Sequence, residues 1–335
     1  MKRADFAGAL VAALAWIGFT GAPLTWGVAA QADSFPSHPL TMMVGFPPGG
    51  PTDTLARIVA DGMKNALGQP IAVETVSGAG GTIATGRVVH ASPDGYTIGI
   101  GQWNSHVGSP ALYPLDYDVL KDLQPISLLT SSPNWVIGGT DLQPKSGAEL
   151  IQWLKAHPEL VTYATVGVGS PSHLMGLMLA KATGARFQFV PYRGAAPVMQ
   201  DMLAGQIQMS GLEASGSFPN VQSGKIQAFA VASAKRWAKS PNTPTFLELG
   251  VPDLVIDFWH GLWTTQGTPK AIVDRLNSAV RTALADPAVR QRIEGLGQTI
   301  FPADQQTPDA LAAYNKAEIE KWWPVIKAAG IRAEN

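Results

Sequence analysis

Residues 45–53 read Gly45-Phe46-Pro47-Pro48-Gly49-Gly50-Pro51-Thr52-Asp53, and this stretch decides the fold. An apolar run, residues 40–44, precedes it and has the length and continuity of a strand buried on both faces. A helical pattern follows, with its apolar side chains on one side and Gly68 beyond its end. The stretch is therefore a turn from a strand into a helix at the C-terminal edge of a parallel sheet, where open α/β folds bind ligands.

The composition of this turn suits a small anion. Gly49 and Gly50 let the backbone approach a bound group, and the start of the helix presents unpaired N–H donors. Pro47, Pro48 and Pro51 each remove a donor. Neither the Gly-Lys-Ser/Thr ending of a P-loop nor the G-x-G-x-x-G of a dinucleotide site is present. A carboxylate, which needs only two or three donors, therefore fits better than a triphosphate, and a tight turn without a ligand is the alternative.

The same device recurs further along the chain. Residues 71–76 predict a second strand, which runs into Ser77-Gly78-Ala79-Gly80-Gly81-Thr82, and a helix over about 83–91 follows. A third strand, 97–101, delivers Trp103 and Asn104 to the same edge. Because such turns face one crevice in a doubly wound sheet, the second turn strengthens the prediction of an anion site.

Composition and motifs exclude several classes. With a net charge of −1, the chain lacks the basic footprint of a nucleic-acid-binding protein. The absence of cysteine rules out disulfides, cysteine nucleophiles and thiolate metal sites. No G-x-S-x-G, S-x-x-K or H-E-x-x-H motif occurs, and the six histidines are scattered. We therefore expect no catalytic residues, no metal and no cofactor; an exported hydrolase acting on an organic acid ester is the enzymatic alternative.

The N-terminus is typical of an exported protein. Lys2 and Arg3 precede an apolar run from residue 6 to about 19, and small residues follow, ending Val28-Ala29-Ala30-Gln31-Ala32. We expect a signal peptide over residues 1–32, cleaved after Ala30 or Ala32, and a soluble, exported mature protein. The alternative is an uncleaved membrane anchor, for which the run is short.

Alternating strands and helices predict a second lobe with its own parallel sheet. Residues 123–130 and 135–138 fit two strands separated by a loop, and residues 254–264 form an apolar run leading back to the first lobe. The expected fold is α/β with two lobes, each a mostly parallel sheet flanked by helices. We assign residues 33–133 and 255–335 to the first lobe and residues 134–254 to the second.

Two turns of the second lobe carry further candidates. In the stretch 167–173, Ser170 and Ser172 each either cap the helix that begins there or donate a hydroxyl to a ligand. In the stretch 192–197, Arg193 pairs either with a ligand carboxylate or with an acidic neighbour. Trp103 in the first lobe either stacks on a flat ligand or fills the core.

In the order and spacing of its motifs, the chain resembles the periplasmic receptors of tripartite tricarboxylate transporters, the Bug or TctC-like family. The resemblance runs from about Pro39 to Ile331. The stretches that carry it are Phe46 to Asp53, Gly78 to Thr82, Ser92-Pro93-Asp94-Gly95-Tyr96, Gly167 to Leu174, Val190-Pro191-Tyr192-Arg193-Gly194 and Ala328-Ala329-Gly330-Ile331.

The resemblance implies a monomeric periplasmic receptor with a two-lobed periplasmic-binding-protein (Venus-flytrap) fold, which closes on a small carboxylic acid such as a dicarboxylate and is then bound by the permease subunits of the transporter. A narrower hypothesis is an aromatic or apolar-bodied acid on which Trp103 stacks. A receptor that presents its ligand to a sensor kinase is the alternative. The first-lobe turns would hold one carboxylate, and second-lobe turns the remainder. The ligand-binding residues expected in this sequence are Phe46, Pro48, Gly49, Gly50, Thr52, Asp53, Ser77, Gly78, Ala79, Gly80, Gly81, Thr82, Trp103, Asn104, Gly169, Ser170, Ser172 and Arg193.

The sequence departs from the family pattern in two places. The family often has an aspartate-containing stretch after the pair matching Gly205-Gln206, and this chain has no aspartate between Gln206 and Glu213. The missing aspartate argues against an amino acid as the ligand. In addition, His260 replaces a usual phenylalanine.

Overall fold

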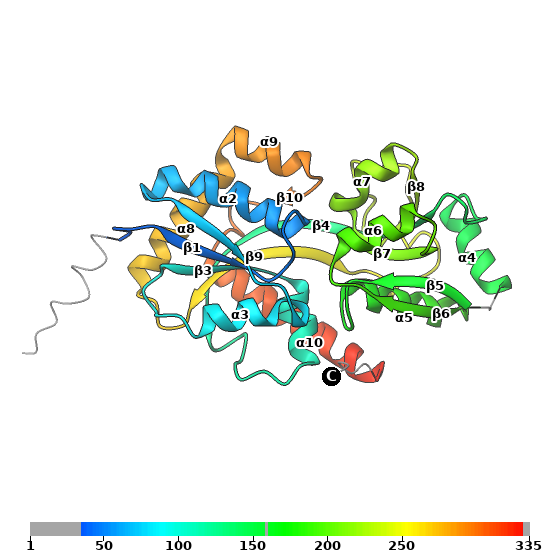
Figure 1. The fold of residues 1–335 in the computed structure, drawn as a ribbon, viewed down its shortest axis with the longest axis horizontal. Helices are drawn as coiled ribbons and strands as arrows, with labels where there is room; N and C mark the ends of the chain where they lie inside the picture. The colour runs from blue at the N-terminus through cyan, green and yellow to red at the C-terminus, as the bar shows by residue number, and fades with distance from the viewer. Residues whose placement is uncertain (1–34, 158–159, 331–335) are drawn as a thin grey trace, which may run out of the picture.

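The computed structural model describes residues 35–157 and 160–330. The predicted signal peptide lies outside the described residues. Figure 1 shows two bodies side by side, each a twisted sheet with helices on its faces, joined where strands pass from one body into the other. No helix in the described ranges is both long and apolar enough to cross a bilayer.

The first sheet is built around β1 (Leu40–Val44), which is parallel to β2 (Ile71–Thr75) and to β3 (Thr97–Gln102). Next to β3 come β9 (Asp257–Thr265) and then β4 (Leu123–Gly139), both joined in antiparallel pairs, and β10 (Thr299–Ile300) also pairs with β4. The parallel part of the sheet is therefore the part that delivers the predicted glycine-rich turns.

The second sheet begins on the same strand. The C-terminal half of β4 lies antiparallel to both β7 (Met209–Glu213) and β8 (Ile226–Val231). Beyond β7 come β5 (Leu160–Thr165) and β6 (Arg186–Pro191), each parallel to its neighbour. The two sheets are thus mixed, because β4 passes from one body into the other and, together with β9 in the first sheet, adds antiparallel pairs to the predicted parallel ones.

The expected loop at residues 131–134 is wrong. Pro133 pairs with Asp257 in the first sheet and Asn134 pairs with Glu213 in the second, so β4 continues through this segment. The strand tolerates Pro133 in an irregular ladder, with register shifts near residues 125–130. Strand pairing divides the chain near these residues, and the lobe boundaries given above stay a prediction.

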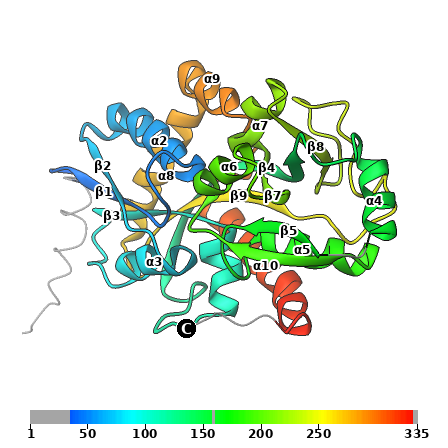
Figure 2. The ribbon, with the colours of Figure 1, turned by 45° about the vertical axis from the view of Figure 1, so that its right-hand side comes forward.

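Helices cover both faces of each sheet. Beside the first sheet lie α2 (Pro51–Leu67), α3 (Thr82–Val89), α8 (Lys270–Ala285), α9 (Pro287–Gly295) and α10 (Pro308–Ala328). Beside the second lie α4 (Gly147–Ala156), α5 (Pro171–Thr183), α6 (Ala195–Leu203) and α7 (Ala214–Gln222). Figure 2 shows α6 and α7 on one face of the second sheet and α5 on the other.

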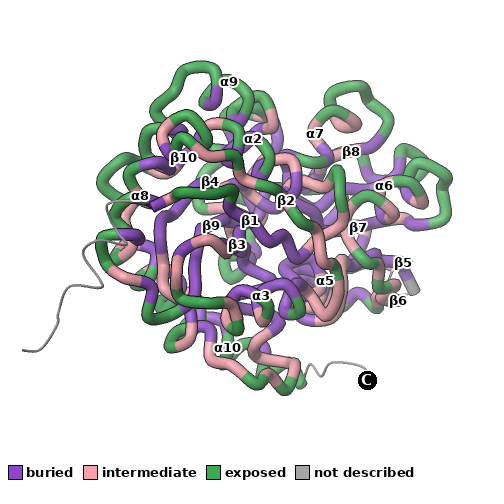
Figure 3. Tube along the Cα trace, turned by 60° about the vertical axis from the view of Figure 1, so that its left-hand side comes forward, coloured by how far each residue is buried: buried purple, intermediate pink, exposed green. Residues whose placement is uncertain are grey.

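Alternating side chains of the central strand divide the first core. Met42 and Val44 pack toward α2 and α8, whereas Met43 packs toward Val88 on α3. A continuous cluster that includes Trp103 of the first body and Tyr163 of the second joins the two cores. Figure 3 shows the strands buried and the helices exposed on their outer sides. The sheet edges that carry the turns therefore rest on a packed support.

Candidate functional site

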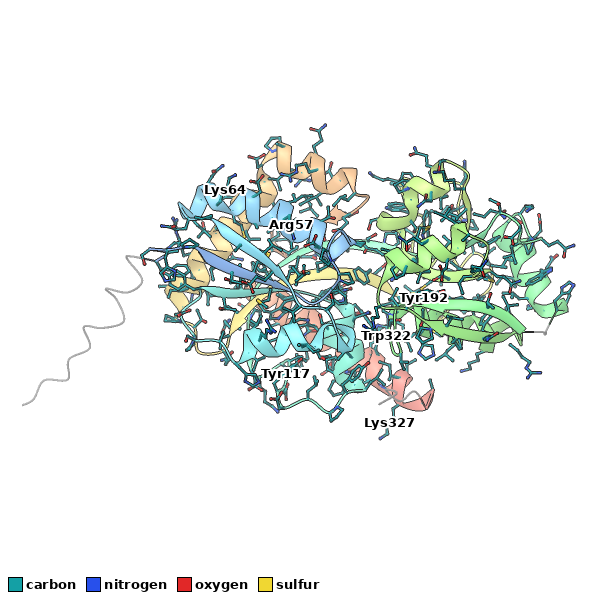
Figure 4. All side chains as sticks on the ribbon, in the orientation of Figure 1. Arg57, Lys64, Tyr117, Tyr192, Trp322 and Lys327 are labelled. Carbon is teal, nitrogen blue, oxygen red and sulfur yellow. The ribbon has the colours of Figure 1, made fainter. Side chains whose placement is uncertain are left out.

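The side chain of Asp53 holds the first turn together through hydrogen bonds. The Asp53 carboxylate is buried, and its Oδ2 accepts hydrogen bonds from the Gly49 N–H at 2.9 Å and from Arg57 Nε at 3.1 Å. Burial pushes the pKa of Asp53 up, but hydrogen bonds from Arg57 and Gly49 and the charge of Arg57 together hold the pKa below its usual value. Figure 4 labels Arg57 on α2. Asp53 is therefore a charged clasp for the turn, and it takes up the N–H of Gly49.

Removing this clasp should destabilise the protein measurably. Asp53→Ala leaves the Gly49 N–H without its acceptor, and we expect the free energy of unfolding in urea to fall by about 1–3 kcal/mol. Asp61→Ala is the matched control, because Asp61 lies in the same helix with ion pairs to Lys64 and Arg292 but is about half exposed; an exposed pair contributes about 0–1 kcal/mol. Equal effects of the two substitutions would contradict the clasp.

The second turn packs directly onto the first. Its 3₁₀ segment, η1 (Ala79–Gly81), has positive φ at each residue, and Gly78 before it has φ 144°. A methyl group on Gly45 would lie 2.7 Å from Cα of Gly81, and one on Gly81 would lie 2.9 Å from Cζ of Phe46. The two turns are thus in backbone contact, which only glycine permits at these positions.

Both turns present backbone donors that have no acceptor among the described residues. The N–H groups of Thr52 and Asp53 stand in the first turn of α2, where no intrahelical acceptor exists, and no other described residue accepts from them. The N–H groups of Gly78, Ala79 and Gly80 likewise have no acceptor among the described residues. The partial positive charge at the start of a helix the length of α2 adds to these donors. Chemically, this arrangement accepts a small anion.

Exposure differs among the predicted residues of these turns. Pro48, Gly49 and Ser77 are exposed; Phe46, Gly50, Gly78, Ala79 and Gly80 are half-buried; and Thr52, Asp53, Gly81 and Thr82 are buried. The Thr82 hydroxyl donates to the carbonyl of Ala79 at 2.9 Å, so it stabilises the second turn.

The packing of Trp103 favours the core alternative over stacking on a ligand. Its side chain is fully buried, and its indole N–H donates to Oε2 of Glu318 at 3.0 Å. Its ring meets Trp322 edge-on at a centroid distance of 5.8 Å. Sequence pattern gives no sign of this because Glu318 and Trp322 come from α10, at the far end of the chain. Trp103 is a core residue that ties its strand end to α10.

Asn104 opens a short π-helical segment, η2 (Asn104–Gly108). Such segments are rare in proteins, and those that occur are often found at functional sites. The side chain is buried, and its Oδ1 has no hydrogen-bond partner among the described residues. Asn104 therefore remains a candidate, with an acceptor to offer.

The third turn reaches the first body through Gly169. A Cβ there would overlap Leu112, and a Cβ on Gly108 would lie 2.6 Å from the carbonyl oxygen of Gly169. The two serines of this turn are occupied internally. Ser170 caps α5 and donates to the carbonyl of Gly167 at 2.6 Å, and its Oγ lies 2.7 Å from that of Ser172. Because the Ser170 hydroxyl already donates its proton to the Gly167 carbonyl, Ser172 must donate to Ser170. Neither serine therefore has a hydroxyl proton left for a ligand.

The fourth turn lies against the first. A methyl group on Gly194 would lie 3.5 Å from Cγ of Pro47, and one on Gly216, in α7, would lie 3.0 Å from Cγ of Pro51. Arg193 is exposed, and it makes no ion pair with another described residue. Figure 4 labels its neighbour Tyr192 on the second body, on the side toward the first. Turns from both bodies therefore meet at one junction.

Two buried titratable groups lie behind this junction and were not predicted as site residues. Burial raises the pKa of Glu213 to about 7, partly offset by hydrogen bonds from Ser215 and Gln298. Burial lowers the pKa of His260 to about 3. The only signal in the sequence was that both residues fall at departures from the family pattern.

Two α/β bodies that share crossing strands and bring their glycine-rich turns together define a periplasmic binding protein. The chain belongs to the tripartite tricarboxylate transporter receptor family, since the model of that family matches residues 55–331. This finding confirms the resemblance on which the fold was predicted.

Individual relatives agree. The chain is 38% identical to a UPF0065 protein of Agrobacterium vitis, over 93% of this chain and 90% of that protein. The structure of the periplasmic binding protein BugD superposes with a TM-score of 0.83 at 36% identity, covering 90% of this chain and all of that one. MatC from Rhodopseudomonas palustris, solved with bound malate, superposes with a TM-score of 0.81 at 36% identity, covering 87% of this chain and all of that one.

Proposed function

We propose that this chain is a periplasmic receptor that captures a small carboxylic acid between its two lobes and delivers it to the permease of a tripartite tricarboxylate transporter. The observation that carries the proposal is the pair of packed turns. The N–H groups of Thr52 and Asp53 on one side, and of Gly78, Ala79 and Gly80 on the other, have no acceptor of their own among the described residues. A carboxylate has two oxygens and takes two or three such donors.

Charge at the junction permits an anion. Arg57 pairs with the Asp53 carboxylate at 2.9 Å, so the one acid buried in the first turn is neutralised. On the opposite side, Arg193 offers an exposed guanidinium near the contact of Gly194 with Pro47. Malate bound to a relative at 36% identity supports a dicarboxylate as the ligand class. The packing of Trp103 removes the reason for expecting an aromatic acid.

Lobe movement is part of this proposal. A cavity of about 10 Å³ lies under the junction, lined by Gly45, Gly81 and His106 among others, and it is too small for an organic acid. The contacts of Pro47 with Gly194 and of Pro51 with Gly216 would separate to admit a ligand and form again around it. The hinge lies where β4 and the return segment before β9 pass between the bodies.

A thermal-shift panel tests the proposal. Mono-, di- and tricarboxylates, malate and adipate included, are added to the purified mature protein at millimolar concentration. At least one acid should raise the midpoint, because a ligand present at 100 times its dissociation constant stabilises by about 2.7 kcal/mol. The dimethyl ester of the same acid, which keeps the carbon skeleton but not the charge, should have no effect. No shift with any acid, or equal shifts with acid and ester, would overturn carboxylate capture.

A further inference from the structure

A chain of buried polar side chains runs from the first turn to the second lobe. Thr52 Oγ1 lies 3.1 Å from His260 Nε2, and His260 Nδ1 lies 3.3 Å from Thr130 Oγ1. Thr130 Oγ1 donates to Gln298 Oε1 at 2.5 Å, and Gln298 Nε2 donates to Glu213 Oε1 at 3.2 Å. All five side chains are at least nine-tenths buried. The first lobe supplies four members and the second lobe supplies Glu213.

The order of the protons along this chain follows from its members. Thr130 has one hydroxyl proton and gives it to Gln298, so it must accept from Nδ1–H of His260. Burial keeps His260 neutral, so its Nε2 carries a lone pair and accepts the hydroxyl proton of Thr52. Each side chain therefore donates a hydrogen bond to the next one, in one direction from Thr52 to Glu213.

The carboxyl group of Glu213 is the last member of this row of hydrogen-bonded side chains, and the groups around it are neutral. On β4 it faces Ser132 and Asn134, on α7 it accepts a hydrogen bond from the Ser215 hydroxyl, and between α9 and β10 it meets Gln298. None of these is charged, and the next titratable group along the chain is His260. With its pKa raised to about 7 by burial, Glu213 changes its charge in the neutral range.

We propose that His260 is a positioning residue that relays the ionisation of Glu213 in the second lobe to Thr52 in the first turn. An ionised Glu213 polarises each donor of the chain toward itself, because hydrogen bonds in series strengthen one another. The oxygen of Thr52 is then left as an acceptor only, and the residue is held by the bond to His260. Since the N–H of Thr52 is one of the donors assigned above to the acid, the consequence for capture rests on the proposed function, whereas the relay itself does not.

Nitrogen-15 spectra of histidine-labelled protein test the relay without any added acid. Long-range spectra recorded from pH 5.5 to 8.5 should show His260 as the Nδ1–H tautomer throughout. The chemical shift of His260 Nε2 should change with pH in a single transition. The midpoint of this transition should equal that of the Glu213 carboxyl carbon, measured on glutamate-labelled protein. The amide of Thr52 should follow the same curve. His260→Phe identifies the resonance and keeps an aromatic ring in the core.

Three variants decide the outcome. In Glu213→Gln the titration of His260 should disappear. Gln298→Met and Thr130→Val each break the row of hydrogen bonds, at successive links. In both variants Glu213 should still titrate, while the His260 shift should no longer change with it. Two such variants are used in case one fails to fold, which circular dichroism shows. An Nε2–H tautomer, or a His260 titration that persists in either cut variant, would overturn the relay. Either result leaves carboxylate capture standing, because no acid is present.

Discussion

Gly45→Ala should weaken acid binding strongly and destabilise the protein. The added methyl group would lie 2.7 Å from Cα and 2.9 Å from O of Gly81. Both atoms belong to the backbone of the second turn, so no side-chain rotation relieves the contact. The turns must move apart, and we expect the free energy of unfolding to fall by about 2–3 kcal/mol, as for other overpacked sites. Separation of the two donor sets should weaken the affinity for the best acid of the panel at least ~100-fold, or about 2.7 kcal/mol.

Gly62→Ala is the control that separates binding from folding. A methyl group on Gly62 would lie 2.8 Å from Cβ of Ala283, so it clashes between α2 and α8, away from the turns. Calorimetric titration of both variants should find a similar loss of stability but unchanged acid affinity in Gly62→Ala. If Gly45→Ala binds the acid as tightly as the parent protein, the packed turns do not form the anion site.

Acid should destabilise the protein through two buried histidines. Burial lowers the pKa of both His106 and His260 to about 3, from an ordinary 6.5. The unfolded chain therefore binds protons that the folded chain does not, so this stability is complete above pH 6.5 and is lost as the pH falls toward 3. Between pH 6.5 and pH 4 the difference of about 2.5 pH units corresponds to roughly 3 kcal/mol for each histidine.

Variants assign this acid sensitivity to particular rings. Urea unfolding at a series of pH values should show a shallower acid loss in His260→Phe than in the parent protein. His90→Phe is the control, since His90 is exposed and pairs with the exposed Asp116, and it should leave the slope unchanged. A parent slope retained in His260→Phe would mean that His260 is protonated in the folded state, against the neutral ring assigned above.

Glu213 acts in the opposite direction. Its pKa is raised from 4.5 to about 7, so the stability it contributes is present below pH 4.5 and is lost as the pH rises through 7. Counting these three groups, stability should rise with pH to a maximum near pH 6.5, because the two histidines outweigh Glu213, and should fall between about pH 6.5 and 7, where only Glu213 changes its charge.

The turns were predictable because their chemistry is local. Glycine and proline at 45–51 and 77–81 mark where a strand ends and a helix begins, and the strands before them are apolar throughout. A helix cap was equally local, as at Ser170, whose side chain accepts from the amide of His173. A signal that lies within about ten residues needs no tertiary structure to be interpreted.

Long-range packing could not be predicted in the same way. The stretch Ser131 to Asn134 has the composition of a loop, yet pairing with β9 and β7 on either side keeps it in a strand. Trp103 lies at a strand end like a ligand-facing residue, but α10 covers it. The relay joins Thr52 to His260, 208 residues apart, and no periodicity brings such residues together.

The most direct test of the central claim is a crystal structure of the mature protein with the acid that gives the largest thermal shift. We expect one carboxylate between the two turns, within hydrogen-bond distance of the N–H groups of Thr52 and Gly80, with Gly169 and Arg193 on its other side. A different surface of the first lobe also has cationic side chains, the groove beside Arg281 and Arg290. An acid bound there, with the packed turns unoccupied, would contradict capture between the lobes.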